Sequence, residues 1–295
     1  MTQNSKSIVL AAVAVLSWAT VATAFKIALQ HLTVYNMLFI ATVTATVIYT
    51  VMMTVEGKWG ALLRIPKKVA LEALALGLLN PTVYYMILFQ AYDMLPAQVA
   101  QPVNYAWPIF LVIMLAVFNR ERIPWRKYIG MAISVGGVVC ISMGGGGVEG
   151  RLSAAGIGMA LLSAVLWGVY WMVNERLKNK LDTTSALFLG FAVGSVVLGV
   201  GGWISGAIEV GSRAGVLSGI YIGCFEMGIP FLAFGMALRT TKNPALVNQM
   251  CYLSPFLSLF LISMILCEKI APATYAGLAL IVAGLVYNQY FVKDR

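Results

Sequence analysis

Long apolar stretches alternate with short polar links along the whole chain. We place apolar runs at 8–29, 35–55, 69–89, 94–117, 127–144, 153–173, 184–206, 214–238, 244–266 and 272–292. A helix of about 20 residues crosses the roughly 30 Å of hydrocarbon in a bilayer. The runs lack the weak two-residue alternation of an outer-membrane barrel. The pattern therefore predicts an all-α integral membrane protein with ten transmembrane helices.

The fourth run contains polar residues that a simple lipid anchor would not need. The segment 95–108 reads LPAQVAQPVNYAWP, and polar side chains in hydrocarbon usually face a bundle interior or a cavity. Gln101, Asn104, Tyr105 and Pro108 share one helical face. We predict that this face borders a cavity; helix–helix hydrogen bonding by the amides is the alternative.

A related segment occurs in the ninth run, 147 residues further along. The segment 242–255 reads KNPALVNQMCYLSP, and its Asn248, Tyr252 and Pro255 occupy the positions of Gln101, Tyr105 and Pro108. We expect the two segments to face each other across a central path, with Pro108 and Pro255 as hinges.

The repeat extends beyond these two segments. Between residues 105 and 139, the shift of 147 gives ten identities in 35 positions, including Glu121 with Glu268. Roughly three would be expected by chance in so apolar a chain. We predict two repeats, 1–147 and 148–295, joined by the glycine-rich segment 144–147 and the polar run that follows it to Ser153. Each repeat has five spans, an odd number, so the second is inverted, an architecture typical of secondary transporters.

Composition and charge agree with a membrane protein. The chain is 60% apolar and 11% charged, with a mean hydropathy of +0.86. The net charge of +9 does not indicate a nucleic-acid partner, because the basic residues sit at span ends. With the N-terminus in the cytoplasm, sixteen of the twenty basic residues fall inside and four outside. This bias predicts that both termini are cytoplasmic.

Aromatic residues within the spans suggest what such a cavity could bind. Those predicted to line it are Trp18, Tyr84, Trp107, Trp167 and Trp171. Flat rings suit an aromatic or cationic amphiphilic solute through stacking or cation–π contact. Plain packing of the rings is the alternative.

Glu226 lies near the middle of the eighth run, among apolar residues. It could exchange a proton or bind a cationic group, and it could equally serve as a structural hydrogen-bond donor in its neutral form. The four cysteines and single histidine have no zinc-site spacing, so we expect no metal and no cofactor. An enzyme is disfavoured because the chain lacks a nucleophile–base set, and there is no nucleotide-binding motif.

The ten spans, the two five-span halves and the Glu-x-Ile-x-x-x-x-Tyr-x-Gly continuation at 121–130 and 268–277 resemble the drug/metabolite transporter superfamily and its EamA-type exporters. The tryptophans and tyrosines make the chain most similar to the YddG-type aromatic amino acid exporters of bacteria. The resemblance implies a basket of helices around a central cavity, outward transport and a place in the bacterial inner membrane.

The leading hypothesis is therefore a secondary-active exporter of amino acids, preferentially aromatic or other apolar ones, that works by alternating access. An exporter of lipophilic cations of the methyl viologen type is the alternative. A channel and a membrane-embedded enzyme have less support. The expected partners are a small-molecule substrate and the lipid bilayer, and the chain could act as a monomer.

Overall fold

The structure is a computed structural model that describes residues 3–119, 124–144, 152–177, 180–209, 211–241, 246–247 and 250–290. Within these ranges the chain forms helices and no strands. The first half contains α1 (Gln3–Leu29), α2 (Val34–Val55), α3 (Trp59–Leu62), α4 (Lys67–Gly77), η1 (Leu78–Val83), α5 (Tyr84–Met94), α6 (Ala97–Asn104), α7 (Trp107–Asn119) and α8 (Trp125–Gly144). The second contains α9 (Ala154–Leu177), α10 (Thr183–Ser205), α11 (Arg213–Ile222), η3 (Gly223–Gly228), α12 (Ile229–Thr240), α14 (Leu253–Ile265) and α15 (Pro272–Tyr290).

The helices match the apolar runs of the sequence. Eight continuous helical segments in the described ranges are long and apolar enough to cross a membrane, and α14 and the helix at 272–288 are shorter apolar helices. Together they account for the ten predicted spans, and the all-α membrane fold is confirmed. Residues 145–151 of the predicted linker lie outside the described residues.

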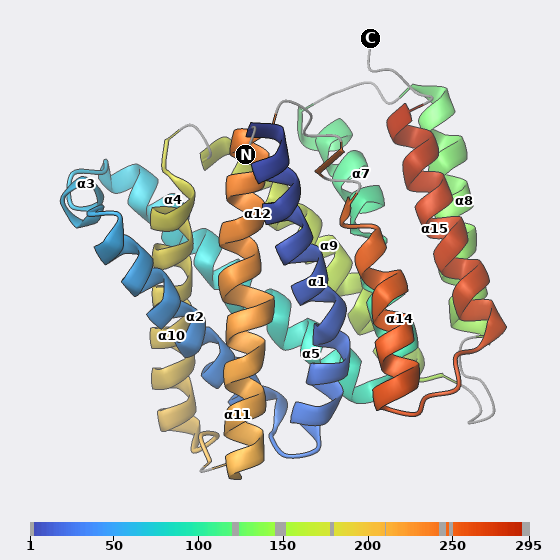
Figure 1. Ribbon diagram of the computed structural model, residues 1–295, viewed down its shortest axis with the longest axis horizontal. Helices are drawn as coiled ribbons and strands as arrows, with labels where there is room; N and C mark the ends of the chain where they lie inside the picture. The colour runs from blue at the N-terminus through green and yellow to red at the C-terminus, as the bar shows by residue number, and fades with distance from the viewer. Residues whose placement is uncertain are drawn as a thin grey trace.

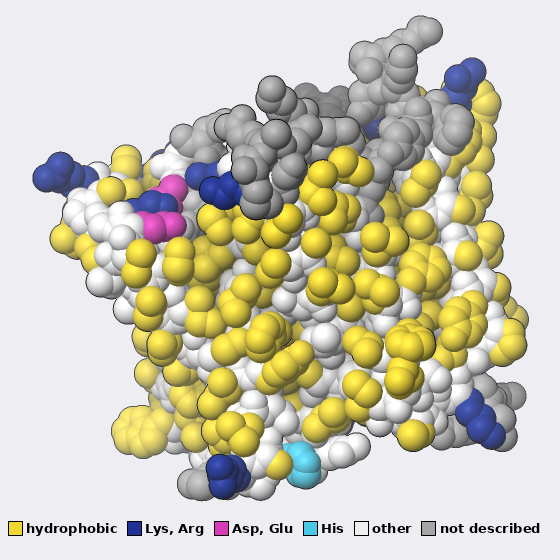
Figure 2. Space-filling model, in the orientation of Figure 1, with side chains coloured by type: hydrophobic (Ala, Val, Ile, Leu, Met, Phe, Trp, Pro, Cys, Tyr) yellow, Lys and Arg dark blue, Asp and Glu magenta, His cyan; other side chains and the backbone are white. Residues whose placement is uncertain are grey.

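The outer surface has the polarity of a membrane protein. Figure 2 shows hydrophobic side chains over most of the visible face, with the charged side chains toward its upper and lower edges. Large apolar side chains such as Val117, Val196 and Phe260 are more than half exposed. Because exposed apolar area of this extent is unfavourable in water, this band is the surface that faces lipid.

Two spans are interrupted in their middle, at corresponding places in the two halves. A π-helical turn, η1, separates α4 from α5, and a second, η3, separates α11 from α12. Asn80 within η1 has an extended backbone, with φ −136° and ψ 115°. A residue that precedes a proline is disfavoured in the helical region, and Pro81 follows Asn80, so the sequence accounts for the first break.

The fourth and ninth spans also break symmetrically. Tyr105 and Ala106 form a turn between α6 and α7, and Cys251 and Tyr252 form a turn just before α14. Pro108 and Pro255 lie in the first turns of the helices that follow, where a proline removes no helical hydrogen bond. The predicted bend points therefore coincide with real interruptions, and their role as hinges stays a prediction.

Helices α8 and α15 pack closely at one side of the bundle (Figure 1). A Cβ added at Gly130 would lie 2.6 Å from the Gly284 carbonyl oxygen, and one added at Gly277 would lie 2.6 Å from that of Gly137. Glycine at positions 130, 137, 277 and 284 therefore lets the two backbones approach closely. Gly136 has no such role, because an added Cβ there would meet nothing within 4 Å.

The glycine contacts also define the relative direction of α8 and α15. Residue numbers rise along α8 as they fall along α15 at successive contacts, so the two helices are antiparallel. They are the last spans of the two halves, and equivalent spans run in opposite directions when one half is inverted. Helix α1 begins and α15 ends at the same edge of the bundle (Figure 1), as an even number of spans requires.

Candidate functional site: an aromatic cavity

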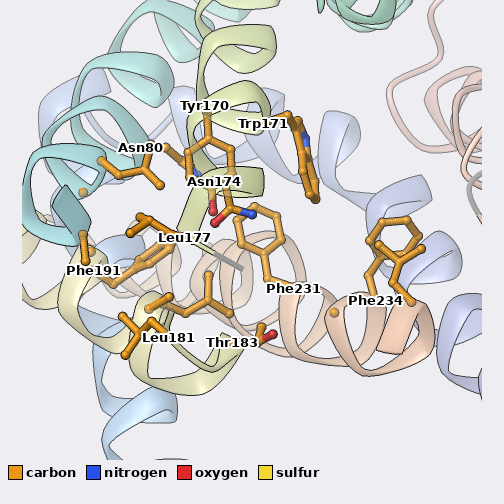
Figure 3. Close-up of a pocket in the computed structure, with 18 of the residues that line it drawn as sticks. Asn80, Tyr170, Trp171, Asn174, Leu177, Leu181, Thr183, Phe191, Phe231 and Phe234 are labelled. Atoms are coloured by element: carbon orange, nitrogen blue, oxygen red, sulfur yellow. The ribbon is translucent and has the colours of Figure 1, made fainter. Parts of the chain in front are cut away.

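A cavity opens between α1, α4, α9, α10 and α12, with η1 at one end. The space between its lining side chains is about 1030 Å³, open mouth included. Figure 3 shows Asn80, Tyr170 and Trp171 toward one end and Leu181 and Thr183 toward the other. Because both halves contribute to its walls, relative motion of the halves would change its shape.

Stacked rings form one wall of the cavity. Trp167 lies between Tyr84 and Tyr170, with ring centroids at 4.6 Å and 5.2 Å and interplanar angles of 27° and 17°. These side chains come from α5 and α9. Stacking on both faces fixes the orientation of the Trp167 indole, and the indole also lines the cavity.

Further aromatic side chains complete the walls. Trp18 meets Phe234 edge-on at 5.4 Å, and Phe231 lies 5.8 Å from Trp167. Trp107, from α7, stacks behind Trp171 at 6.3 Å. The cavity can therefore surround a flat or branched apolar group with ring surface.

The polar groups of the cavity are mostly uncharged. Asn80, Asn174 and Thr183 line it, and the indole nitrogen of Trp171 has no hydrogen-bond partner among the described residues. Arg239, an exposed residue, is the single charged group among the described lining residues, and none of them is acidic. This chemistry offers hydrogen bonds and apolar contact without a negative charge.

Glu226 lies behind the wall and not on it. Its Oε1 accepts a hydrogen bond from the Tyr85 hydroxyl at 2.9 Å, and its Oε2 has no partner among the described residues. Its backbone carbonyl accepts a hydrogen bond from the Trp18 indole at 3.2 Å. Glu226 therefore contacts Trp18, which lines the cavity, but does not line the cavity itself.

The structure separates the predicted site residues into two groups. Trp18, Trp167 and Trp171 line the cavity, and Tyr84 and Trp107 support them from behind by stacking. The predicted polar face of the fourth span lies elsewhere: Gln101, Asn104 and Tyr105 are not among the lining residues.

The side chains of that polar face are buried between helices. The Asn104 amide donates to Ser163 of α9 at 2.8 Å, which is the interhelical bonding that was the alternative interpretation. Gln101 is 3% exposed, with no partner for its oxygen among the described residues. Helix α6 contacts α14, which begins within the last residues of the second segment; that the two segments face each other across a path stays a prediction. Tyr252 is half-buried, and Asn248 lies outside the described residues.

The end of the bundle opposite the cavity mouth is closed by polar contacts. Gln98 accepts hydrogen bonds from the Ala271 amide at 2.9 Å and the Thr274 hydroxyl at 3.2 Å, and donates to the Lys269 carbonyl at 3.1 Å. Glu268 accepts from the Ala97 amide at 3.3 Å, so this acid caps the start of α6, which is distant from it in sequence. These bonds join the start of α6 to the link between α14 and α15.

Sequence reasoning missed Asn80, Tyr170 and Asn174 as cavity residues. A signal for Asn80 was available, because Asn-Pro inside an apolar run combines an unneeded amide with a helix break. Tyr170 and Asn174 lie one helical turn apart, on the face that also carries Trp167 and Trp171.

Comparison with known proteins agrees with this architecture. The model of the EamA-like transporter family matches the chain twice, at residues 5–143 and 154–288. The chain belongs to the EamA-like transporter family. The two matches correspond to the two repeats, and membership makes the chain a transporter of small molecules across a membrane and not an enzyme.

Several relatives of this EamA-like transporter are described only as transporters. An uncharacterized transporter, YvbV, of Bacillus subtilis is 26% identical over 70% of this chain and 68% of its own length. An uncharacterized transporter of Archaeoglobus fulgidus is 24% identical over 95% of this chain and 97% of its own length. A probable terminal-alkyne amino-acid exporter of Streptantibioticus cattleyicolor is 25% identical over 96% of this chain and 93% of its own length.

A solved crystal structure has the same fold as this EamA-like transporter. It superposes with a TM-score of 0.69 at 21% sequence identity, over 95% of both chains. At this identity the similarity supports the arrangement of the helices and carries no information on substrate.

Proposed function

We propose that this protein is a secondary-active exporter of amino acids with aromatic or other apolar side chains. The observation that carries the proposal is an aromatic cavity whose described lining offers amide and indole hydrogen-bonding groups and no acidic side chain. An apolar amino acid combines a side chain that fits ring surface with a compact polar head that needs hydrogen bonds. The relative named as a probable amino-acid exporter supports the same substrate class.

The alternative, export of lipophilic cations, draws support from the same rings, since aromatic faces attract cations. Two features argue against it. The described lining has no carboxylate to pair with a positive charge, and the charged residue at its edge is the cationic Arg239. A buried dication would then have only ring faces and neutral amide and hydroxyl groups to replace its hydration. A zwitterion brings its own carboxylate beside its ammonium group, which offsets part of this cost.

The cavity mouth lies where an exporter would load its solute. With the N-terminus in the cytoplasm, as the basic residues indicate, the cavity opens toward the connection between α9 and α10 on the cytoplasmic side. The contacts of Gln98 and Glu268 close the opposite end. This is the state that would load a solute from the cytoplasm, in the inner membrane of a bacterium.

Alternating access would exchange the conformations of the two halves, 1–147 and 148–295. The breaks at η1 and η3, and those before Pro108 and Pro255, occur at corresponding places in each half. Interrupted helices of this kind allow parts of a span to tilt independently. We therefore assign Pro108 and Pro255 as hinges of this exchange.

Counterflow in liposomes tests the proposal. Purified protein is reconstituted with trapped unlabelled phenylalanine, and entry of labelled phenylalanine, tryptophan, leucine and a methyl viologen-type dication is followed. We expect saturable, protein-dependent counterflow of the amino acids, with none in protein-free liposomes. Counterflow of the dication without amino acids would favour the alternative function, and non-saturable entry would indicate a channel.

A further inference from the structure

The two interrupted spans carry different polar groups at their breaks. The break in the second half places Glu226 against Tyr85, behind the cavity wall. The break in the first half places Asn80 on the cavity itself. The acid is thus withdrawn from the cavity, and an uncharged amide residue lines the cavity at the corresponding break.

Packing against α10 fixes the position of Asn80. A Cβ added at Gly77 would lie 2.5 Å from the Gly190 Cα, so the backbones of α4 and α10 nearly touch just before the break. Pro81, just after the break, fills the space over Gly194, where an added Cβ would lie 2.8 Å from its ring. The turn that carries Asn80 is therefore seated against glycines of α10 in this state.

The Asn80 side chain lacks a well-formed hydrogen bond. It is 2% exposed, and neither its nitrogen nor its oxygen has a hydrogen-bond partner among the described residues. The Tyr170 hydroxyl interacts with the amide, but without the geometry of a full hydrogen bond. An unsatisfied buried amide costs roughly 1–3 kcal/mol, and such groups usually have a functional reason.

The position of the amide suggests that reason. Figure 3 shows Asn80 near Tyr170 and Asn174 at the end of the pocket away from Leu181 and Thr183. Asn80 is also one of the residues that line the cavity. Asn80 thus borders the space that a substrate would fill. Its amide lies just beneath the cavity surface, where a bound solute that displaces the neighbouring side chains could complete its hydrogen bonds.

We propose that Asn80 binds the head group of the transported amino acid and selects zwitterions over cations. Its amide nitrogen donates to the substrate carboxylate, and its amide oxygen accepts from the substrate ammonium group, so one side chain satisfies both charges. Because the amide is neutral, a solute with a net positive charge finds no counter-ion at this place. The inference rests on the proposed function, since it names the group that recognises its substrate.

Three variants in reconstituted liposomes test this inference. Asn80→Ala removes both hydrogen-bonding groups, and Asn80→Asp adds a negative charge at nearly constant volume. Asn288→Ala is the matched control, because the Asn288 amide oxygen is also buried without a partner among the described residues but lies against Gly130 at the α8–α15 contact, outside the cavity. Labelled phenylalanine and its methyl ester, which is a cation below neutral pH, serve as probes.

We expect Asn80→Ala to raise the KM for phenylalanine counterflow at least about tenfold, as loss of a hydrogen bond to a charged group predicts, and Asn288→Ala to change it less than about twofold. Asn80→Asp should invert the preference, so that the ester enters faster than phenylalanine. The monodisperse elution and thermal midpoint of each variant establish that it is folded.

Failure of the role of Asn80 can be distinguished from failure of the proposed function. Wild-type phenylalanine counterflow with an unchanged KM in Asn80→Ala, or an unchanged preference in Asn80→Asp, overturns the role of Asn80 alone. If the wild type carries no amino acid, the proposed function falls, and the role of Asn80 falls with it.

Discussion

The Ser134 hydroxyl of α8 donates a hydrogen bond to the Ile281 carbonyl oxygen of α15 at 3.0 Å, and these two residues occupy the same position in the two repeats, 147 residues apart. The contacts on either side of them are exchanged by the same shift, since Gly130 meets Gly284 and Gly137 meets Gly277. A twofold axis between two antiparallel helices produces this arrangement. The last spans of both halves therefore meet at the symmetry axis of the inverted repeat.

The glycines at this axis should be sensitive to a single added methyl group. A Cβ at Gly137 would clash with the Gly277 carbonyl oxygen, whereas one at Gly136 would meet nothing within 4 Å. We expect Gly137→Ala to destabilise the protein by about 1–3 kcal/mol through overpacking. Gly136→Ala, with its better helix propensity, should be neutral or stabilising by up to about 1 kcal/mol. Thermal unfolding in one detergent measures both, and equal midpoints would contradict the close packing.

The ring stack should affect substrate selection. Trp167 lines the cavity and is held between Tyr84 and Tyr170. We expect Trp167→Ala to weaken phenylalanine counterflow by about 2–10-fold more than leucine counterflow, because an aromatic contact is worth about 0.5–1.5 kcal/mol beyond its buried area. Trp203→Ala is the control, since Trp203 is 81% exposed on the outer surface. Equal losses for the two substrates in Trp167→Ala would mean that the ring only fills space.

The architecture was readable from the sequence because membrane physics constrains it strongly. Apolar length predicts spans, basic residues predict orientation, and an odd number of spans in each repeat predicts inversion. The glycine contacts could be predicted from the repeat because Gly130, Gly137, Gly277 and Gly284 recur at its spacing. Gly136 has no such recurrence, and an added Cβ there would meet no neighbour within 4 Å.

The cavity was less predictable because polarity does not reveal which way a side chain faces. Gln101 and Asn104 satisfy the pattern of a cavity face, yet Asn104 bonds to Ser163 between helices. Asn80 could not be predicted from the repeat, because the corresponding position in the other half does not carry an amide. Its place on the cavity depends on the backbone approach of Gly77 to Gly190, which is a tertiary feature.

Glu226 is the residue through which transport could be coupled to protons. It is 8% exposed, bonds to Tyr85 and contacts the cavity through Trp18. If it carries the proton, Glu226→Gln should retain counterflow, which needs no driving force, and lose accumulation driven by a pH gradient. Glu268→Gln, at the closed end of the bundle, is the matched control and should keep pH-driven accumulation. Accumulation that persists in Glu226→Gln would remove Glu226 from the coupling mechanism.

An ion pair beside the start of α10 should make stability depend on pH. The Lys58 ammonium lies 2.7 Å from Asp182 and 2.6 Å from Glu56, and Asp182 also caps α10 by accepting from the Ser185 amide at 3.2 Å. Partial burial opposes ionisation of Asp182, but its hydrogen bonds from Lys58 and Ser185 outweigh this and lower its pKa. A carboxylate whose pKa is lowered by folding stabilises the folded state at pH values above its ordinary pKa of about 3.9. This stabilisation is lost as the pH falls through the pKa of the folded state.

Substitution of Asp182 separates the ion pair from the cap. An asparagine at this position would still cap α10, so Asp182→Asn should cost no more than about 1 kcal/mol at about pH 7, the value of a partly exposed pair. Asp182→Ala loses the cap as well and should cost about 1 kcal/mol more. Thermal midpoints between about pH 7 and pH 3 measure both, and the gap between wild type and Asp182→Asn should close below about pH 4. A gap of the same size at about pH 3 would show that the charge of Asp182 does not stabilise this end of the bundle.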